Sequence, residues 1–155
     1  MASEQVFLDT SALFAAVLSA TGGARQLFKL GEAGVITLWV GPTVLAEMDA
    51  VLTRKSPGSK GALALLLDRA KVQIGPAPAP TMQAQAQAVV TYPPDADVAT
   101  EAVDAEALAA QVDYLVSLDR QHLVDNPRNT ALPFPIGTPG DCLAWLRARW
   151  PSRNV

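Results

Sequence analysis

The chain has 155 residues, of which 50% are hydrophobic and 17% charged, with a formal net charge of -3. This composition excludes an intrinsically disordered chain, which needs low hydrophobicity and high net charge, and the single cysteine, Cys142, excludes a scaffold built on intramolecular disulfides. No apolar run reaches the roughly 20 residues that cross a bilayer, and the first residues lack the basic start of a signal peptide, so we expect a soluble cytoplasmic protein with no membrane partner.

Apolar runs that favour strands alternate with stretches of helical periodicity. Residues 35–40 (VITLWV) are the clearest strand, a continuous apolar run of the kind found where helices cover both faces of a sheet. The other predicted strands are residues 5–8, 71–75, 113–118 and 134–136. Helices are predicted to begin after Asp9, where Thr10 and Ser11 can cap the first turn, and after Gly41 and Thr138. Further helices are predicted over residues 60–70 and 97–112, and around residues 27–30. This alternation predicts an α/β fold with three layers (α/β/α) around a central, mostly parallel sheet.

The stretch from residue 76 to about residue 96 has a different composition. It contains PAPAP, the repetitive QAQAQA and a Tyr-Pro-Pro sequence. Because proline cannot donate to a strand ladder and restricts the residue before it, we predict an extended connection that encloses a short helical or strand-like piece. The parts on either side are too short to fold well alone, so we expect residues 1–155 to form a single domain.

Two predicted strands end in an aspartate. Asp9 closes VFLD and Asp119 closes YLVSLD. An aspartate at a strand end commonly caps the next helix, but in an open parallel sheet the carboxyl ends of the strands also form the ligand site. Two carboxylates held close together repel, and they persist when protonated, separated by water or bridged by a cation. Glu47, early in the helix after residues 35–40, is a third acid that can lean towards this edge.

A row of acids lies on the predicted helix over residues 97–112. Asp97, Glu101 and Asp104 are spaced i, i+4 and i+7, which places them on one face beside the apolar face. Like charges at this spacing are unfavourable, so the row is either solvated or faces a cation. Its border with the buried face favours the second interpretation.

The motifs, taken in order, resemble those of PIN-domain nucleases, and most closely the PIN-family toxins of bacterial toxin–antitoxin pairs. They are DTS at the first strand end, a glutamate in the helix after the second strand, an acid-rich helix, DYLVSLD running into RQHL, and a late TPGDCLAWL. The resemblance covers nearly the whole chain. It implies a central parallel sheet and four acids that bind Mg2+ or Mn2+ and hydrolyse RNA.

Carried over residue by residue, the resemblance assigns Asp9, Glu47 and Asp119 to the acid cluster. Thr10 and Ser11 match the small hydroxyl residues that support the first aspartate. The third acid departs from the family pattern, because its place falls on Thr100 or Glu101 where an aspartate is usual. We assign Glu101 to this place, with Asp97 and Asp104 as its alternatives.

The expected partners follow from the same resemblance. Arg120, Arg25, Arg54 and Lys55 are candidates for contacts with the phosphates of an RNA substrate. The resemblance also implies an antitoxin protein as partner and a homodimer. The alternative to a metal-dependent endoribonuclease is a non-catalytic PIN-like module that binds RNA or protein, and the irregular third acid favours it.

Overall fold

The computed structural model describes residues 3–89, 98–120, 124–125 and 131–150, without the side chains of residues 87–89 and 98–101. Five parallel strands form one sheet in the order β3-β2-β1-β4-β5. The strands are β1 (Glu4–Leu8), β2 (Ile36–Val40), β3 (Gln73–Ile74), β4 (Tyr114–Val116) and β5 (Ile136–Gly137). The predicted three-layer α/β/α architecture with a parallel central sheet is therefore confirmed.

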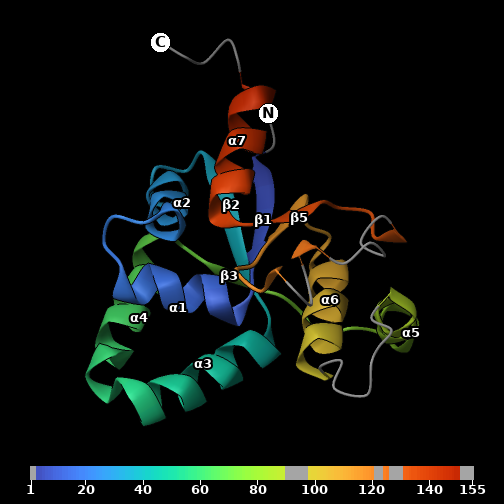
Figure 1. Cartoon of the computed structure of the whole chain (residues 1–155), viewed down its shortest axis with the longest axis horizontal. Coiled ribbons are helices and arrows are strands. Elements are labelled where there is room, and N and C mark those ends of the chain that lie inside the picture. Colours follow the sequence, from blue (N-terminus) through green and yellow to red (C-terminus); the bar gives the residue numbers. More distant parts are fainter. Residues whose placement is uncertain (1–2, 90–97, 121–123, 126–130, 151–155) are drawn as a thin grey trace.

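Helices connect the strands and cover the sheet. In Figure 1, α1 and α2 lie to the left of the sheet, and α5 and α6 lie to its right. The helices are α1 (Thr10–Leu18), α2 (Gly23–Glu32), α3 (Pro42–Lys55), α4 (Lys60–Arg69), α5 (Pro80–Val89), α6 (Val98–Ala110) and α7 (Pro139–Arg149), with a short 3-10 turn η1 (Pro57–Ser59). No helix in the described part of the chain has the length and apolar character needed to cross a membrane.

β1 is the centre of the core. Its side chains Val6, Phe7 and Leu8 are fully buried, since β2 and β4 flank the strand and helices cover it. The ladder pairs Phe7 with Trp39 of β2, and Leu8 with Val116 of β4. The three strands therefore end side by side, which places whatever follows them at a common edge.

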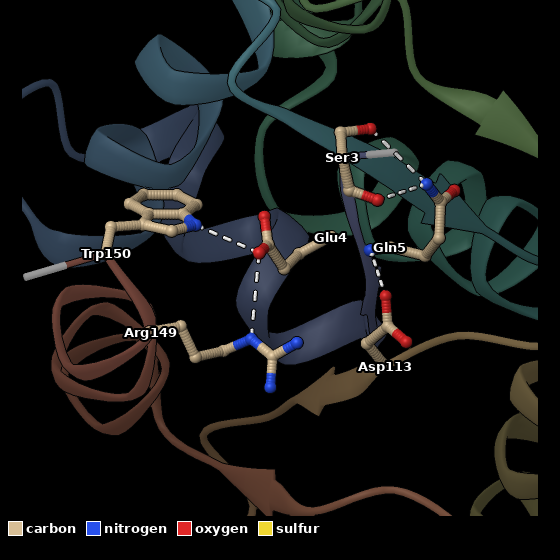
Figure 2. A network of polar contacts seen from close by, with 6 residues as sticks. All are labelled: Ser3, Glu4, Gln5, Asp113, Arg149 and Trp150. Atoms are coloured by element: carbon tan, nitrogen blue, oxygen red, sulfur yellow. Dashed lines mark hydrogen bonds and ion pairs between the residues drawn. The ribbon is translucent and has the colours of Figure 1, made fainter. Parts of the chain in front are cut away.

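The amino end of β1 is held by polar contacts with distant parts of the chain (Figure 2). Glu4 accepts a hydrogen bond of 2.9 Å from the indole N–H of Trp150 and lies 3.6 Å from the guanidinium of Arg149. The backbone N–H of Gln5 donates to Asp113, just before β4, at 2.7 Å. These contacts tie α7 and β4 to β1 at the edge opposite its carboxyl end.

Two details differ from the sequence-based prediction. Pro80–Val89 is a ten-residue helix, so the short helical or strand-like piece expected inside the extended connection is a helix that takes up much of the connection. Proline is tolerated in the first turn of a helix, where its missing N–H has no intrahelical acceptor, and the Ala- and Gln-rich residues after Pro80 are good helix formers. The residue that caps α1 is Asp9 rather than Thr10 or Ser11.

Candidate active site

The candidate site lies where the strand order reverses. From β1 the chain adds β2 and β3 on one side, and it then crosses to add β4 and β5 on the other. Ligands of open parallel sheets bind at the carboxyl ends of the strands beside such a switch point. Asp9 follows β1 directly and Asp119 comes three residues after β4, so both acids lie at this edge of the sheet. The strand expected over residues 113–118 is shorter, since β4 ends at Val116.

Asp9 is buried, with 5% of its surface exposed, and both of its carboxylate oxygens accept hydrogen bonds. Oδ1 accepts from the hydroxyl of Ser11 at 2.7 Å and from the backbone N–H of Ala12 at 2.9 Å, which caps α1. Oδ2 accepts from the hydroxyl of Ser117 at 2.5 Å. A carboxylate oxygen has two lone pairs, and among the described residues only Ser117 donates to Oδ2, so its second lone pair can accept from another ligand.

The protonation of Asp9 reflects this environment. Burial raises the pKa of its carboxyl above the usual value, while the hydrogen bonds from Ser117, Ala12 and Ser11 act in the opposite direction. The negative charge of Asp119 adds to the rise in the pKa of Asp9, which places the two carboxyl groups within electrostatic reach. A cation between them would relieve this repulsion and favour the ionised form of Asp9.

Glu47 is connected to the same region by a hydrogen bond with the first residue of α1. Its Oε2 accepts a hydrogen bond of 2.9 Å from the hydroxyl of Thr10, the first residue of α1. Glu47 is half-buried and belongs to α3, which contacts both α1 and α6. Thr10 and Ser11 thus support two different acids, because Thr10 binds Glu47 while Ser11 binds Asp9.

Of the three candidates for the third acid, Asp104 is the one whose side chain belongs to the described part of the chain. Asp97 lies outside the described residues, and so does the side chain of Glu101. Asp104 is 1% exposed, and neither of its carboxylate oxygens has a hydrogen-bond partner among the described residues. Over the same part of the chain, no group of three His, Cys, Asp or Glu side chains is arranged to hold a metal ion.

The four basic residues considered for RNA contacts lie in different settings. Arg120, beside Asp119, is exposed and forms an ion pair with Asp125 at 3.3 Å. Arg54 and Lys55 are exposed in the last turn of α3. Arg25 is engaged within the chain, since its guanidinium donates to the carbonyl oxygens of Ala16 and Val17 at the end of α1.

Two residues of this region were not singled out from the sequence. Ser117 donates to Asp9 and accepts from the backbone N–H of Asp119 at 2.9 Å, so one hydroxyl links the two aspartates. The sequence feature that could have identified Ser117 is its place in LVSLD, directly after the residue that pairs with the end of β1.

Glu106 is buried in α6, and its carboxylate accepts a hydrogen bond from the backbone N–H of Thr43. No local pattern distinguishes Glu106 from the other acids of its helix.

Ser117→Ala is expected to destabilise the fold. The substitution leaves Asp9 Oδ2 and the N–H of Asp119 without their partner, which costs about 1–3 kcal/mol for a buried group. Urea unfolding measures the difference, with Ser19→Ala, at an exposed position after α1, as the control. Equal stabilities of Ser117→Ala and the wild type would show that this hydroxyl does not hold Asp9.

Comparisons with known proteins agree with the fold described above. Residues 5–121 match the family model described as PIN domain. This chain is similar to a chain in the crystal structure of VapBC2 from Rickettsia felis, which was determined with a DNA fragment from the VapBC2 promoter. The two chains superpose with a TM-score of 0.62 at 15% sequence identity. The match covers 86% of this chain and 96% of the other. None of the curated proteins that were compared matches. With its parallel sheet and the acids at the ends of β1 and β4, the chain belongs to the PIN-domain family.

Proposed function

We propose that this protein is an endoribonuclease that hydrolyses RNA phosphodiester bonds with Mg2+ or Mn2+, and that it is the toxin of a toxin–antitoxin pair. The observation that carries the proposal is the placement of Asp9 and Asp119 at the switch point, where the hydroxyl of Ser117 donates to Asp9 and accepts from the backbone N–H of Asp119. Membership of the PIN-domain family supports it.

The donor chemistry fits a hard divalent cation. Asp9, Glu47 and Asp119 offer only oxygen ligands, and Mg2+ needs few of them because it keeps several of its waters. Asp9 and Asp119 would hold the ion, while Glu47 and Glu101 would complete the site or orient a water. A bound ion supplies a water of lowered pKa and neutralises charge that develops at the phosphate.

The chain's own contribution is to hold these carboxylates ready. Ser11 and the N–H of Ala12 bind one oxygen of Asp9, so the group cannot rotate away. Ser117 binds the other oxygen and leaves one of its lone pairs available. Thr10 holds Glu47 at the start of α1. This preorganisation lowers the cost of assembling the charged transition state.

The RNA would approach from the exposed side of the strand ends. Arg120 would present positive charge to phosphates beside Asp119, and Arg54 and Lys55 would do so from the far end of α3, whereas Arg25 serves as a cap on α1. So few basic residues suit single-stranded or looped RNA, whose backbone and bases are accessible, better than a regular duplex.

The partner proteins are proposed from the structural comparison. One chain of the crystal structure of VapBC2 from Rickettsia felis, which is bound to a DNA fragment from their promoter, has the same fold. We infer an antitoxin that covers the candidate site and a homodimer of this chain, acting in the cytoplasm.

A non-catalytic PIN-like module that binds RNA or protein is the second candidate. The observation that favours it is that the described side chains include no group of three acids arranged around one point. The two functions differ in their need for a metal ion.

Calorimetric titration with Mn2+ separates the two candidates. The wild type is expected to bind Mn2+, to cleave RNA and to lose this activity when a chelator removes the ion. Asp119→Asn is expected to weaken Mn2+ binding by about tenfold or more, and Asp49→Asn, at an exposed residue paired with Lys60 on the outside of α3, should change nothing. A wild type without Mn2+ affinity would favour the non-catalytic module.

A further inference from the structure

The first turn of α3 is capped from another helix. Its N-cap residue is Gly41, which has no side chain to accept a hydrogen bond, and its first residue is Pro42, which has no N–H. The N–H of Thr43 is therefore the first donor of the helix. Both carboxylate oxygens of Glu106 in α6 receive it, at 3.1 and 3.0 Å, and Glu106 is only 3% exposed.

The backbone at Gly41 lies very close to the side chain of Glu106. A Cβ placed on Gly41 would lie 2.6 Å from the carboxyl carbon of Glu106 and 2.8 Å from its Cβ, and closer still to Oε1. Only glycine permits this approach of the two segments, although the backbone of Gly41 is extended and needs no special conformation. The carboxylate also lies at the positive end of the α3 dipole, where a negative charge is favourable.

The capped residue and Glu47 share one face of α3. Thr43 and Glu47 are four residues apart, so Glu47 lies one turn after the contact with Glu106. Glu47 in turn meets the hydroxyl of Thr10 at the start of α1. A shift of the first turn of α3 would therefore move Glu47 relative to Thr10 and the end of β1.

We propose that Glu106 is a positioning residue of the site. It caps α3 in place of Gly41, and it thereby fixes the position of Glu47 relative to Thr10 and Asp9. The role of Glu47 in catalysis rests on the function proposed above, but its placement by Glu106 is a property of the metal-free chain. The two statements can thus be tested apart.

Nuclear magnetic resonance of the metal-free protein tests the placement. In Glu106→Ala, the amide of Thr43 should exchange with solvent about tenfold faster or more, because its buried acceptor is lost, and the carboxyl carbon of Glu47 should change its chemical shift. Glu106→Gln keeps an acceptor oxygen and should restore both signals. A Glu47 carboxyl signal that is the same in the wild type and in Glu106→Ala would overturn the proposal.

Gly41→Ala supplies a second route to the same result without touching the carboxylate. The added methyl group must displace Glu106, so the signals of Thr43 and Glu47 should change in the way expected for Glu106→Ala. Gly41→Ala therefore tests the proposal even if Glu106→Ala does not fold. Gly61→Ala in α4, whose new Cβ meets nothing within 4 Å, is the matched control and should leave both signals unchanged. Unchanged signals in Gly41→Ala would also overturn the proposal.

A double-mutant cycle on RNA cleavage then links the placement to activity. Glu106→Ala should lower kcat about tenfold in the wild-type background, in line with the cost of small misplacements, and hardly at all in a Glu47→Gln background. An equal loss in both backgrounds would mean that Glu106 only stabilises the fold. A wild type that cleaves no RNA would contradict the proposed function, while the resonance measurements would still decide the role of Glu106.

Discussion

Asp9→Asn is expected to abolish RNA cleavage while the fold remains intact. The amide oxygen of asparagine can still accept from Ser11 and from the N–H of Ala12, so the cap of α1 survives. The amide nitrogen meets Ser117, whose hydroxyl can turn to accept a hydrogen bond. What disappears is the negative charge, and with it several kcal/mol of metal-assisted stabilisation, so the rate of cleavage should fall about 100-fold or more.

The measurement is single-turnover cleavage of a labelled RNA in Mg2+ and in Mn2+, alongside urea unfolding of the same samples. Asp49→Asn removes an exposed carboxylate from α3, where Asp49 pairs with Lys60, and should keep wild-type activity. If Asp9→Asn retained metal-dependent cleavage at the wild-type rate, Asp9 would have no part in the reaction.

Replacement of the buried carboxyl of Asp104 is expected to change how stability depends on pH. Asp104 is 1% exposed and lacks a hydrogen-bond partner among the described residues, so burial raises its pKa from 3.8 to about 7. The folded protein therefore holds this proton up to about pH 7, whereas the unfolded chain releases it near pH 4. Between these values the folded state binds more protons, so the free energy of unfolding falls as the pH rises.

The size of this pH dependence of the free energy of unfolding follows from the rise in the pKa of Asp104. At 1.36 kcal/mol for each pH unit, the contribution of Asp104 lost between pH 4 and pH 7 is about 4 kcal/mol. Urea unfolding at several pH values should show this fall in the wild type and a flatter curve in Asp104→Asn, which never carries the charge. The difference between the two proteins isolates Asp104 from Asp9, whose pKa is also raised by burial.

The matched control is Asp68→Asn, at an exposed acid near the end of α4. It should leave the pH dependence as it is in the wild type. Parallel curves for the wild type and Asp104→Asn would instead show that the carboxyl of Asp104 stays charged in the folded protein.

The secondary structure could be read from the sequence because its signals are local. The run over residues 35–40 contains β2, and Thr138 caps α7 through its hydroxyl and Asp141. The acids at strand ends could be found in the same way, because parallel strands bring their carboxyl ends to one edge. In the proline-rich stretch, the prolines predicted an extended chain, but the helix-forming residues after Pro80 favour a helix and form α5.

The sequence alone thus determined the fold class and predicted that Asp9 and Asp119 follow neighbouring strands, since periodicity and strand ends are properties of neighbouring residues. The supporting contacts were decided by the tertiary structure. Thr10 meets Glu47 across 37 positions, Glu106 meets Thr43 across 63, and Ser117 meets Asp9 across 108. Such pairs form only once the strand order places β4 beside β1, and α6 against the start of α3. No local propensity encodes that order, because it results from the joint burial of all the apolar faces.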